Sequence, residues 1–277
     1  MFKIIIAITL ILLISIFDSE QQTKRSNNNS NNNTNKSLSD EKPSFFDLTP
    51  FGKPQYVECN NQTINRLDVF TQKLVESRFP TNGRELRNFC NTGIKSAGFL
   101  LGFAKHCLTE FTQKALQVVF YPVTNEISLI CKSGKLSNKA KAIIKAARCG
   151  NAARPGLKKC YNKFIIKEIG IKSTKDNKLK IPMLCCEFNV LRECFKQTAE
   201  DNKECTRRTI DFVERYALEM FGEILNLMCF DYHDSSDKCD RIRSLVPDIK
   251  YEEIEKPKSF IPPMIDILKD IGNGFDF

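Results

Sequence analysis

This 277-residue sequence has few histidines and no pair of cysteines at the spacing of metal-binding motifs. It contains only two histidines, His106 and His233, and no C-x-x-C pair. Structural zinc sites and thioredoxin-type redox sites are built from such residues, so neither is expected. His233 lies in the polar run DYHDSSDKCD, whose spacing does not match the twelve-residue loop of calcium sites. The sequence therefore predicts no metal site and no cofactor.

The motifs of common catalytic machineries are missing as well. The chain has no G-x-S-x-G, no H-E-x-x-H and no Gly-rich phosphate loop. His106 lies on an apolar helical segment beside Cys107, and no second motif supplies a catalytic partner for it. We therefore interpret His106 as a core or boundary residue. No catalytic residue is predicted, and the sequence favours a protein that is not an enzyme.

Only one long hydrophobic run occurs, at the start of the chain. Residues 4–17 are almost entirely apolar, follow Lys3 and precede Ser19, a small residue suited to cleavage. Such a run is short for a membrane span and typical of a secretory signal peptide, which we place at residues 1–19; a signal anchor is the alternative. No later segment is long and apolar enough to cross a bilayer. We expect a secreted, extracellular protein, for which nucleic acid is not an expected partner.

Cysteine, by contrast, is abundant. All twelve cysteines follow the predicted signal peptide, and an even number in an exported chain favours six disulfides formed in an oxidising compartment. The folded part is long enough to bury a hydrophobic core, so the disulfides add to burial rather than replace it. The predicted half-cystines are Cys59, Cys90, Cys107, Cys131, Cys149, Cys160, Cys185, Cys186, Cys194, Cys205, Cys229 and Cys239.

Residues 20–55 are rich in asparagine and poor in apolar residues, and they predict a disordered leader. Acceptors for N-linked glycans, N-x-S/T, begin at Asn28, Asn32, Asn35 and Asn61. The first three lie in an Asn-rich tract, where such triplets arise by chance. Asn61 stands at the edge of the folded region and is the strongest candidate.

Hydrophobic periodicity predicts a helical domain over residues 56–245. Between Met183 and Cys229, two apolar stripes of helical period flank a polar break at Thr198–Lys203, which indicates a helical hairpin. No segment shows sustained strand-like alternation. The predicted fold is therefore all-α, a disulfide-stapled bundle of about six to eight helices. The Pro-containing tail 246–277 is either a short amphipathic helix packed on the domain or a loose end.

The adjacent cysteines Cys185 and Cys186 lie on the first arm of this hairpin. Neighbouring side chains on a helix point about 100° apart, whereas a disulfide requires two closely spaced and correctly aimed Cβ atoms. We therefore expect each cysteine to join the helix to a different neighbour. The alternative is one disulfide plus one buried free thiol.

Start and stop signals predict where several helices begin and end. Asn82 followed by Glu85 resembles a capping box at the start of a long apolar helix that reaches to about residue 121. A helix over 138–149 is expected to stop at Gly150, and Pro155 to open the next helix, which runs to residue 170. Lys172–Lys180 is then expected to form an exposed loop.

These boundaries predict two disulfides that clamp turns, Cys149–Cys160 and Cys194–Cys205. In an antiparallel hairpin, positions equally far from the turn face each other, and each pair straddles a predicted turn. The competing interpretation is that these four cysteines reach sideways to other helices, because sequence alone does not fix disulfide connectivity.

Positive charge is concentrated in the middle of the chain. Lys132–Lys180 holds fifteen lysines and arginines against two acids, a net charge of +13, whereas the residues after it carry −7 and the whole chain +9. Solvated helix faces explain such lysines without any function. The functional interpretation is an electrostatic surface for acidic glycans, anionic lipid or a protein partner. The candidate polyanion-binding residues are Lys139, Lys141, Lys145, Lys158 and Lys159.

The cysteine-bearing phrases form a recognisable series. They include CLTEF, LIC, LCCEFNVLREC, KEC and LMC, and span Cys90 to Cys229. In cysteine order, spacing and flanking apolar residues this series resembles the arthropod haemolymph glycoprotein family named for a mass in the high twenties of kilodaltons, or a neighbouring secreted family with vicinal cysteines. The resemblance implies a secreted, helical, cysteine-rich protein and supplies no catalytic residues. The leader and the tail after Cys239 lie outside it.

Three functional hypotheses follow. The first is a haemolymph-like, non-enzymatic extracellular protein that binds an unknown extracellular protein or a small apolar ligand on its helical scaffold. The second is a secreted protein that binds a polyanion or acidic glycan through residues 132–180. The third is a secreted enzyme of unrecognised type. A ligand retained through purification would favour the first, and a salt-sensitive interaction with heparin the second.

Overall fold

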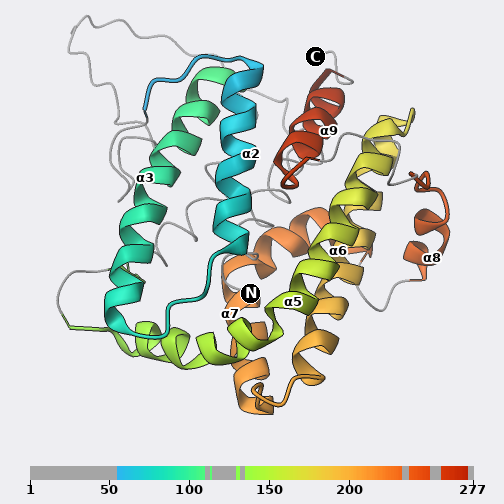
Figure 1. Ribbon diagram of the computed structural model, residues 1–277. Helices are drawn as coiled ribbons and strands as arrows, with labels where there is room; N and C mark the ends of the chain where they lie inside the picture. The colour runs from blue at the N-terminus through green and yellow to red at the C-terminus, as the bar shows by residue number, and fades with distance from the viewer. Residues whose placement is uncertain are drawn as a thin grey trace, which may run out of the picture.

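The computed structural model describes residues 55–109, 113, 129–131, 135–232, 237–249 and 257–273. These residues contain seven α-helices, one 3-10 turn (η2, Phe230–Tyr232) and no strand, which confirms the all-α prediction (Figure 1). The predicted signal peptide, the leader through residue 54, and Asn28, Asn32, Asn35 and His233 lie outside the described residues. The helices are α2 (Asn61–Glu76), α3 (Gly83–Cys107), α5 (Asn138–Ser173), α6 (Asn177–Glu200), α7 (Arg207–Cys229), α8 (Lys238–Arg243) and α9 (Ile261–Asn273).

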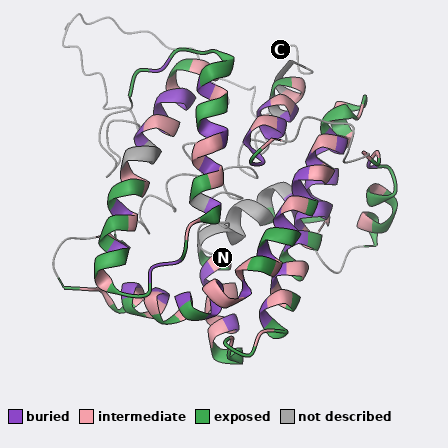
Figure 2. Ribbon diagram, viewed as in Figure 1, coloured by how far each residue is buried: buried purple, intermediate pink, exposed green. Residues whose placement is uncertain are grey.

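Helices α5 and α6 form an antiparallel pair at the centre of the fold. The predicted cap of α5 is confirmed, because the Ser137 hydroxyl accepts a hydrogen bond from the Ala140 N–H at 3.1 Å. The main hydrophobic core lies along the pair and includes Leu157, Phe164 and Leu184, each at most 3 % exposed. Figure 2 shows buried residues recurring along both helices.

The remaining helices cover this pair on several sides. α2 and α9 add residues to the same core, whereas α3, α7 and the first half of α5 share a smaller cluster around Leu86, Ile143 and Tyr216. α6 and α7 form the predicted helical hairpin, with the turn between Glu200 and Thr206, where the Thr206 hydroxyl accepts from the Thr209 N–H.

Two predicted helix boundaries in α5 are wrong. α5 continues without interruption from Asn138 to Ser173, so Gly150 does not end a helix and Pro155 does not begin one. Gly150 is buried where Phe79 packs on the helix, and a Cβ there would lie 3.0 Å from the phenyl ring. Pro155 removes one backbone hydrogen bond and favours a bend, and α5 bends near its middle in Figure 1. Packing therefore overrides both local signals.

The prediction of an exposed loop over Lys172–Lys180 is also wrong. α6 already begins at Asn177, and the Asp176 side chain accepts a hydrogen bond from the Lys178 N–H at 3.0 Å. Lys180 is only 2 % exposed, and its ammonium forms an ion pair with Asp270 at 2.6 Å. A buried lysine is tolerated when it is paired, so a polar sequence here forms a helix start instead of a loop.

Helix α3 is shorter than the long helix predicted to reach residue 121. It ends at Cys107, and Leu108 has extended backbone angles. The Gln113 side-chain amide donates hydrogen bonds to the carbonyls of Lys105 and Leu108, both at 3.0 Å, and so satisfies groups that a longer helix would have bonded. Residues 110–112 and 114–121 of the prediction lie outside the described residues.

All twelve cysteines form disulfides, which confirms the prediction of six bridges with no free thiol. Cys185 joins α6 to Cys229 at the end of α7, and Cys186 joins it to Cys239 on α8. The vicinal cysteines thus bind two different neighbours, as predicted. The other four disulfides are Cys59–Cys107, Cys90–Cys131, Cys149–Cys205 and Cys160–Cys194.

The two predicted turn clamps are wrong, although the same four cysteines are involved. Cys149 and Cys160 lie on one continuous helix, about 16 Å apart along its axis, so they cannot bond each other. Cys160 pairs instead with Cys194 on α6, and Cys149 pairs with Cys205 in the turn that follows α6. The geometric rule was correct, because positions about equally far from a turn face each other. The turn that brings these cysteines together lies at residues 174–176, between α5 and α6, and not at the two predicted positions.

The C-terminal segment is packed on the domain. α9 begins after Phe260, and Phe260, Met264 and Ile267 are at most 2 % exposed within the main core. The Lys258 backbone N–H donates to Asp68 of α2 at 2.9 Å, and the Asn177 amide donates to the Asp270 carbonyl at 2.7 Å. Of the two predicted alternatives for the tail, a packed amphipathic helix or a loose end, the structure shows the packed helix.

Candidate functional site

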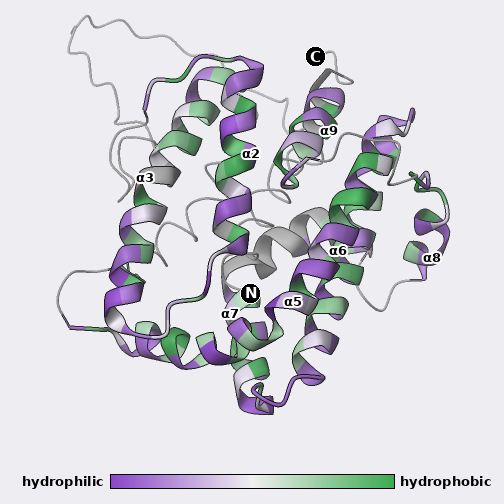
Figure 3. Cartoon of the chain, viewed as in Figure 1, coloured by the Kyte–Doolittle hydropathy of each residue, from purple (hydrophilic) through white to green (hydrophobic). Residues whose placement is uncertain are grey.

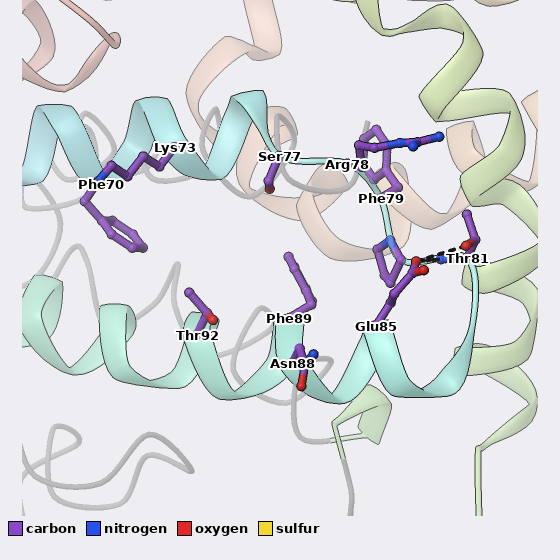
Figure 4. Close-up of a pocket in the computed structure, with 11 residues that line it drawn as sticks. Phe70, Lys73, Ser77, Arg78, Phe79, Thr81, Glu85, Asn88, Phe89 and Thr92 are labelled. Atoms are coloured by element: carbon purple, nitrogen blue, oxygen red, sulfur yellow. Dashed lines mark hydrogen bonds between the residues drawn. The ribbon is translucent and has the colours of Figure 1, made fainter.

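A pocket of about 600 Å³ opens between α2 and α3, beside the loop that joins them (Figure 4). Three phenylalanines line it, one from each part of this hairpin: Phe70 from α2, Phe79 from the loop and Phe89 from α3. In Figure 4, Phe70 and Phe89 extend into the space between the two helices. The pocket volume lies within the range of small-molecule sites in proteins.

The loop at one end of the pocket is held by the capping box that the sequence predicted at Asn82. The Asn82 side chain accepts a hydrogen bond from the Glu85 N–H at 2.9 Å, and Glu85 reaches back to accept from the N–H of Thr81 at 2.7 Å. The Thr81 hydroxyl and the Asn82 amide donate to the same carboxylate. These bonds lower the pKa of Glu85, with those from Thr81 the main cause.

Phe79 forms a fixed wall of the pocket because α5 holds its backbone from behind. Its N–H donates to the Asn151 side-chain oxygen at 2.7 Å, and its carbonyl accepts from the Asn151 amide at 3.0 Å. Its ring packs on Gly150. Further support comes from Arg154, which donates to the Glu76 carbonyl at 2.7 Å, and from the Lys158–Glu76 ion pair at 2.6 Å.

The far end of the α2–α3 hairpin is closed by separate contacts. The disulfide Cys59–Cys107 joins a residue two positions before α2 to the last residue of α3. The Arg66 guanidinium lies 4.6 Å above the centre of the Phe99 ring, in a cation–π contact between the two helices. The hairpin is thus tied at both ends, and the pocket lies near the loop end.

Charged groups lie at the margin of this apolar pocket. Lys73 and Arg78 are exposed cations in its lining, and Glu85 is the one acid there. Ser77, Asn88 and Thr92 add uncharged polar side chains. An arrangement of aromatic surface beside cations suits a small ligand with an apolar body and an anionic group.

His106 lies outside this site. It is exposed near the end of α3, about 21 Å along the helix axis from Thr92, and its ring makes an edge contact with Tyr56 at 5.2 Å. Across the described ranges, no group of three or more His, Cys, Asp or Glu residues is arranged to hold a metal ion.

The five lysines predicted to bind polyanions do not share one face. Lys139 forms an ion pair with Glu219 at 3.6 Å and lies over the Tyr216 ring, and Lys158 pairs with Glu76. Lys141, Lys145 and Lys159 are exposed and point away from the core. The cations of residues 132–180 are therefore divided between intramolecular pairs and a solvent-facing set.

Sequence reasoning missed the pocket and an unusual buried acid. Glu168, the one acidic residue on α5, is 0 % exposed, and neither carboxylate oxygen has a hydrogen-bond partner among the described residues. Burial raises its pKa well above the ordinary value. Burial likewise raises the pKa of Tyr161, whose hydroxyl accepts from the Phe260 N–H at 3.3 Å. The sequence did contain a signal for this buried acid, because Glu168 lies among apolar residues in the segment FIIKEIGI.

The predicted glycan acceptor Asn61 is the first residue of α2 and is exposed. Asn60 before it caps the helix, accepting from the Thr63 N–H at 2.9 Å. Thr63, the third residue of the acceptor triplet, donates its hydroxyl proton to the Glu58 carbonyl at 2.7 Å. The Asn61 side chain is therefore accessible beside a well-ordered helix start.

None of the described helices is both long and apolar enough to span a bilayer. Comparison of the chain with protein-family models, with curated proteins and with solved structures finds no match in any of the three.

Proposed function

We propose that this chain is a secreted, non-enzymatic binding protein that holds a small amphipathic ligand in the pocket between α2 and α3. The ligand class is an apolar body that carries one anionic group. The observation that carries the proposal is the pocket itself, with Phe70, Phe79 and Phe89 beside the cations Lys73 and Arg78.

The way the pocket is supported favours binding. Its loop is fixed by the Asn82–Glu85 capping bonds, and its Phe79 wall is anchored on Asn151, so little conformational freedom is left to lose when a ligand enters. Glu85, the acid in the lining, is engaged by Thr81 and Asn82, and its lowered pKa makes it a poor proton donor at neutral pH.

Export is supported by the six disulfides, which are typical of proteins from oxidising compartments. An N-linked glycan on the exposed Asn61 is part of the same proposal. A role in an extracellular fluid such as haemolymph rests on the resemblance of the cysteine series alone.

The proposal is tested with 1-anilinonaphthalene-8-sulfonate, an aromatic sulfonate whose fluorescence rises in apolar sites. Wild-type protein should bind it saturably. Phe70→Asp places a like charge inside the pocket and should weaken binding tenfold or more, equivalent to about 1.4 kcal/mol. Val190→Asp introduces the same negative charge on the exposed surface of α6 and should have no effect on binding.

A second variant tests the cationic margin. Lys73→Gln should weaken binding of the sulfonate several-fold, because it removes the one ammonium group in the lining, and it should leave binding of a neutral probe such as Nile red unchanged. Absence of saturable binding by the wild type, or equal losses in Phe70→Asp and Val190→Asp with both proteins folded, would overturn the proposal. Native mass spectrometry of protein purified from its own fluid would then identify a bound ligand.

A further inference from the structure

Helix α5 carries an unusual charge pattern. Its sequence from Asn138 to Ser173 contains ten lysines and arginines and one acid, Glu168, which is buried in the core. Hydrophilic residues recur along its whole length in Figure 3. A surface helix normally mixes both signs of charge, because pairs of opposite charge three or four residues apart stabilise it. In α5 the one such spacing, from Glu168 to Lys172, forms no ion pair, because Glu168 is buried and Lys172 pairs with Asp266.

Four of these ten cations, apart from Arg148, form ion pairs with acids on other segments of the chain. Lys139 pairs with Glu219 of α7, Lys158 with Glu76 of α2, and Lys167 with Asp248 at 2.9 Å. Lys172 pairs with Asp266 of α9. These residues lie toward the neighbouring helices, and their charge is used within the fold.

The remaining exposed cations lie on one face of the helix. They are separated by four, three, eleven and four residues, intervals that all return to the same side of an α-helix. We call this set the α5 stripe; it extends about 33 Å along the helix axis. It consists of Lys141, Lys145, Arg148, Lys159 and Lys163, all exposed.

The α5 stripe is largely uncompensated. Arg148 forms an ion pair with Glu204 at 2.5 Å, but its side chain remains 80 % exposed. Lys141, Lys145, Lys159 and Lys163 form no ion pair with any described residue. Lys141 and Lys145, like Lys159 and Lys163, are like charges at spacing i,i+4, an arrangement that destabilises a helix.

We propose that the α5 stripe is a binding surface for an extended polyanion, a linear sulfated polysaccharide. An anion beside each lysine pair would relieve the repulsion within it, and the length of the stripe requires a ligand with charges repeated along a chain. Pro155 lies on the same face between the two cationic ends and is itself exposed. The proposal stands independently of the α2–α3 pocket.

A polysaccharide fits this face better than a membrane. Helices that bind membrane surfaces combine cations with large apolar side chains that enter the lipid. The large apolar side chains exposed on the described surface are Tyr56, Leu129, Val190, Leu218, Phe230 and Leu245, and none of them lies on α5. The middle of the stripe is Ala152 and Pro155.

The test compares two quadruple variants of the full-length protein in binding to heparin. The stripe variant changes Lys141, Lys145, Lys159 and Lys163 to glutamine. The control variant changes Lys135, Lys175, Lys178 and Lys269 to glutamine; these are exposed lysines outside the stripe, form no ion pair with any described residue, and alter net charge equally. The stripe variant should lose at least tenfold in affinity, whereas the control variant should stay within about twofold of wild type.

Salt dependence gives a second measure of the same contacts. By analogy with nucleic acids, each cation–anion contact contributes roughly 0.7–0.9 to the slope of log affinity against log salt concentration. The stripe variant should therefore lose about 3 units of slope, and the control variant almost none. Heparin fragments long enough to span about 33 Å should bind more tightly than a heparin disaccharide.

Three results would overturn the proposal. The first is equal loss of affinity in both quadruple variants, which would mean that net charge alone attracts heparin. The second is equal affinity for the disaccharide and the long fragments, which would indicate a compact site. The third is stripe-dependent binding to vesicles of phosphatidylserine and phosphatidylcholine without heparin binding. Circular dichroism establishes that both variants remain folded.

Discussion

Replacing the buried Glu168 with glutamine should stabilise the protein at neutral pH and flatten its stability profile. Glu168 has no exposed surface, neither carboxylate oxygen has a described hydrogen-bond partner, and burial raises its pKa well above the ordinary 4.5. The folded chain therefore keeps a proton that the unfolded chain releases as pH rises above 4.5. Under linkage, the state that binds more protons loses stability as pH increases, so this residue destabilises the fold at neutral pH.

The size of the effect follows from one proton. The free energy of unfolding falls by up to about 1.4 kcal/mol per pH unit above pH 4.5, until pH reaches the raised pKa of the folded state. Below pH 4.5 both states are protonated and the contribution disappears. Glutamine is neutral at every pH and keeps the shape and polarity of the acid, so the comparison isolates ionisation. The difference between Glu168→Gln and wild type should be near zero at pH 4 and grow toward pH 7.

Urea unfolding between pH 4 and pH 8, followed by circular dichroism, measures this difference. Glu193→Gln, which removes an exposed carboxylate from α6, serves as the control and should follow the wild-type profile. Parallel profiles for wild type and Glu168→Gln would refute the reasoning, because they would mean that Glu168 is ionised at little cost in the folded protein. A Glu168→Gln protein less stable than wild type at pH 7 would do the same.

Two further predictions concern covalent structure. A non-reduced tryptic digest should contain peptides linked through Cys149–Cys205 and Cys160–Cys194, and a Cys149–Cys160 link would contradict this pairing. Replacing both Cys160 and Cys194, which are 34 residues apart, with serine should lower the free energy of unfolding by about 3–4 kcal/mol in the chain-entropy model, as measured by urea unfolding. Protein from its native source should lose mass on treatment with peptide N-glycosidase F, and Asn61→Gln should remove the glycan from that position; an unglycosylated Asn61 in mapped peptides would contradict the proposed modification.

The parts of the fold that local chemistry controls could be predicted from sequence. The apolar stripes of α6 and α7 have the period of a helix, and the caps at Asn82 and Ser137 use side chains that bond their own helix. The separate partners of Cys185 and Cys186 follow from the angle between neighbouring side chains on a helix. Each of these features depends on residues within a turn or two of one another.

The features that sequence reasoning missed depend on contacts between distant segments. Gly150 and Pro155 are ordinary boundary signals, but Phe79 packs on Gly150 and Thr198 of α6 packs on Gly156 beside the proline, so α5 continues. The wrong disulfide pairing Cys149–Cys160 was predicted because a turn was expected between Gly150 and Pro155, where α5 is continuous. Likewise, the α2–α3 pocket exists because Asn151 holds the loop between those helices, and no local pattern encodes that hydrogen bond.

The position of α9 has a consequence for biosynthesis. Phe260, Met264 and Ile267 complete the core between α2 and α5. The apolar face of α2 therefore stays partly uncovered until a segment roughly 200 residues later has been synthesised. All six disulfides involve cysteines up to Cys239, and oxidation can begin while α9 is still being synthesised. During synthesis in an oxidising compartment the emerging chain therefore exposes apolar surface beside reactive thiols, the conditions under which chaperones and disulfide isomerases are needed. Chains truncated before Phe260 should carry all twelve cysteines yet fail quality control.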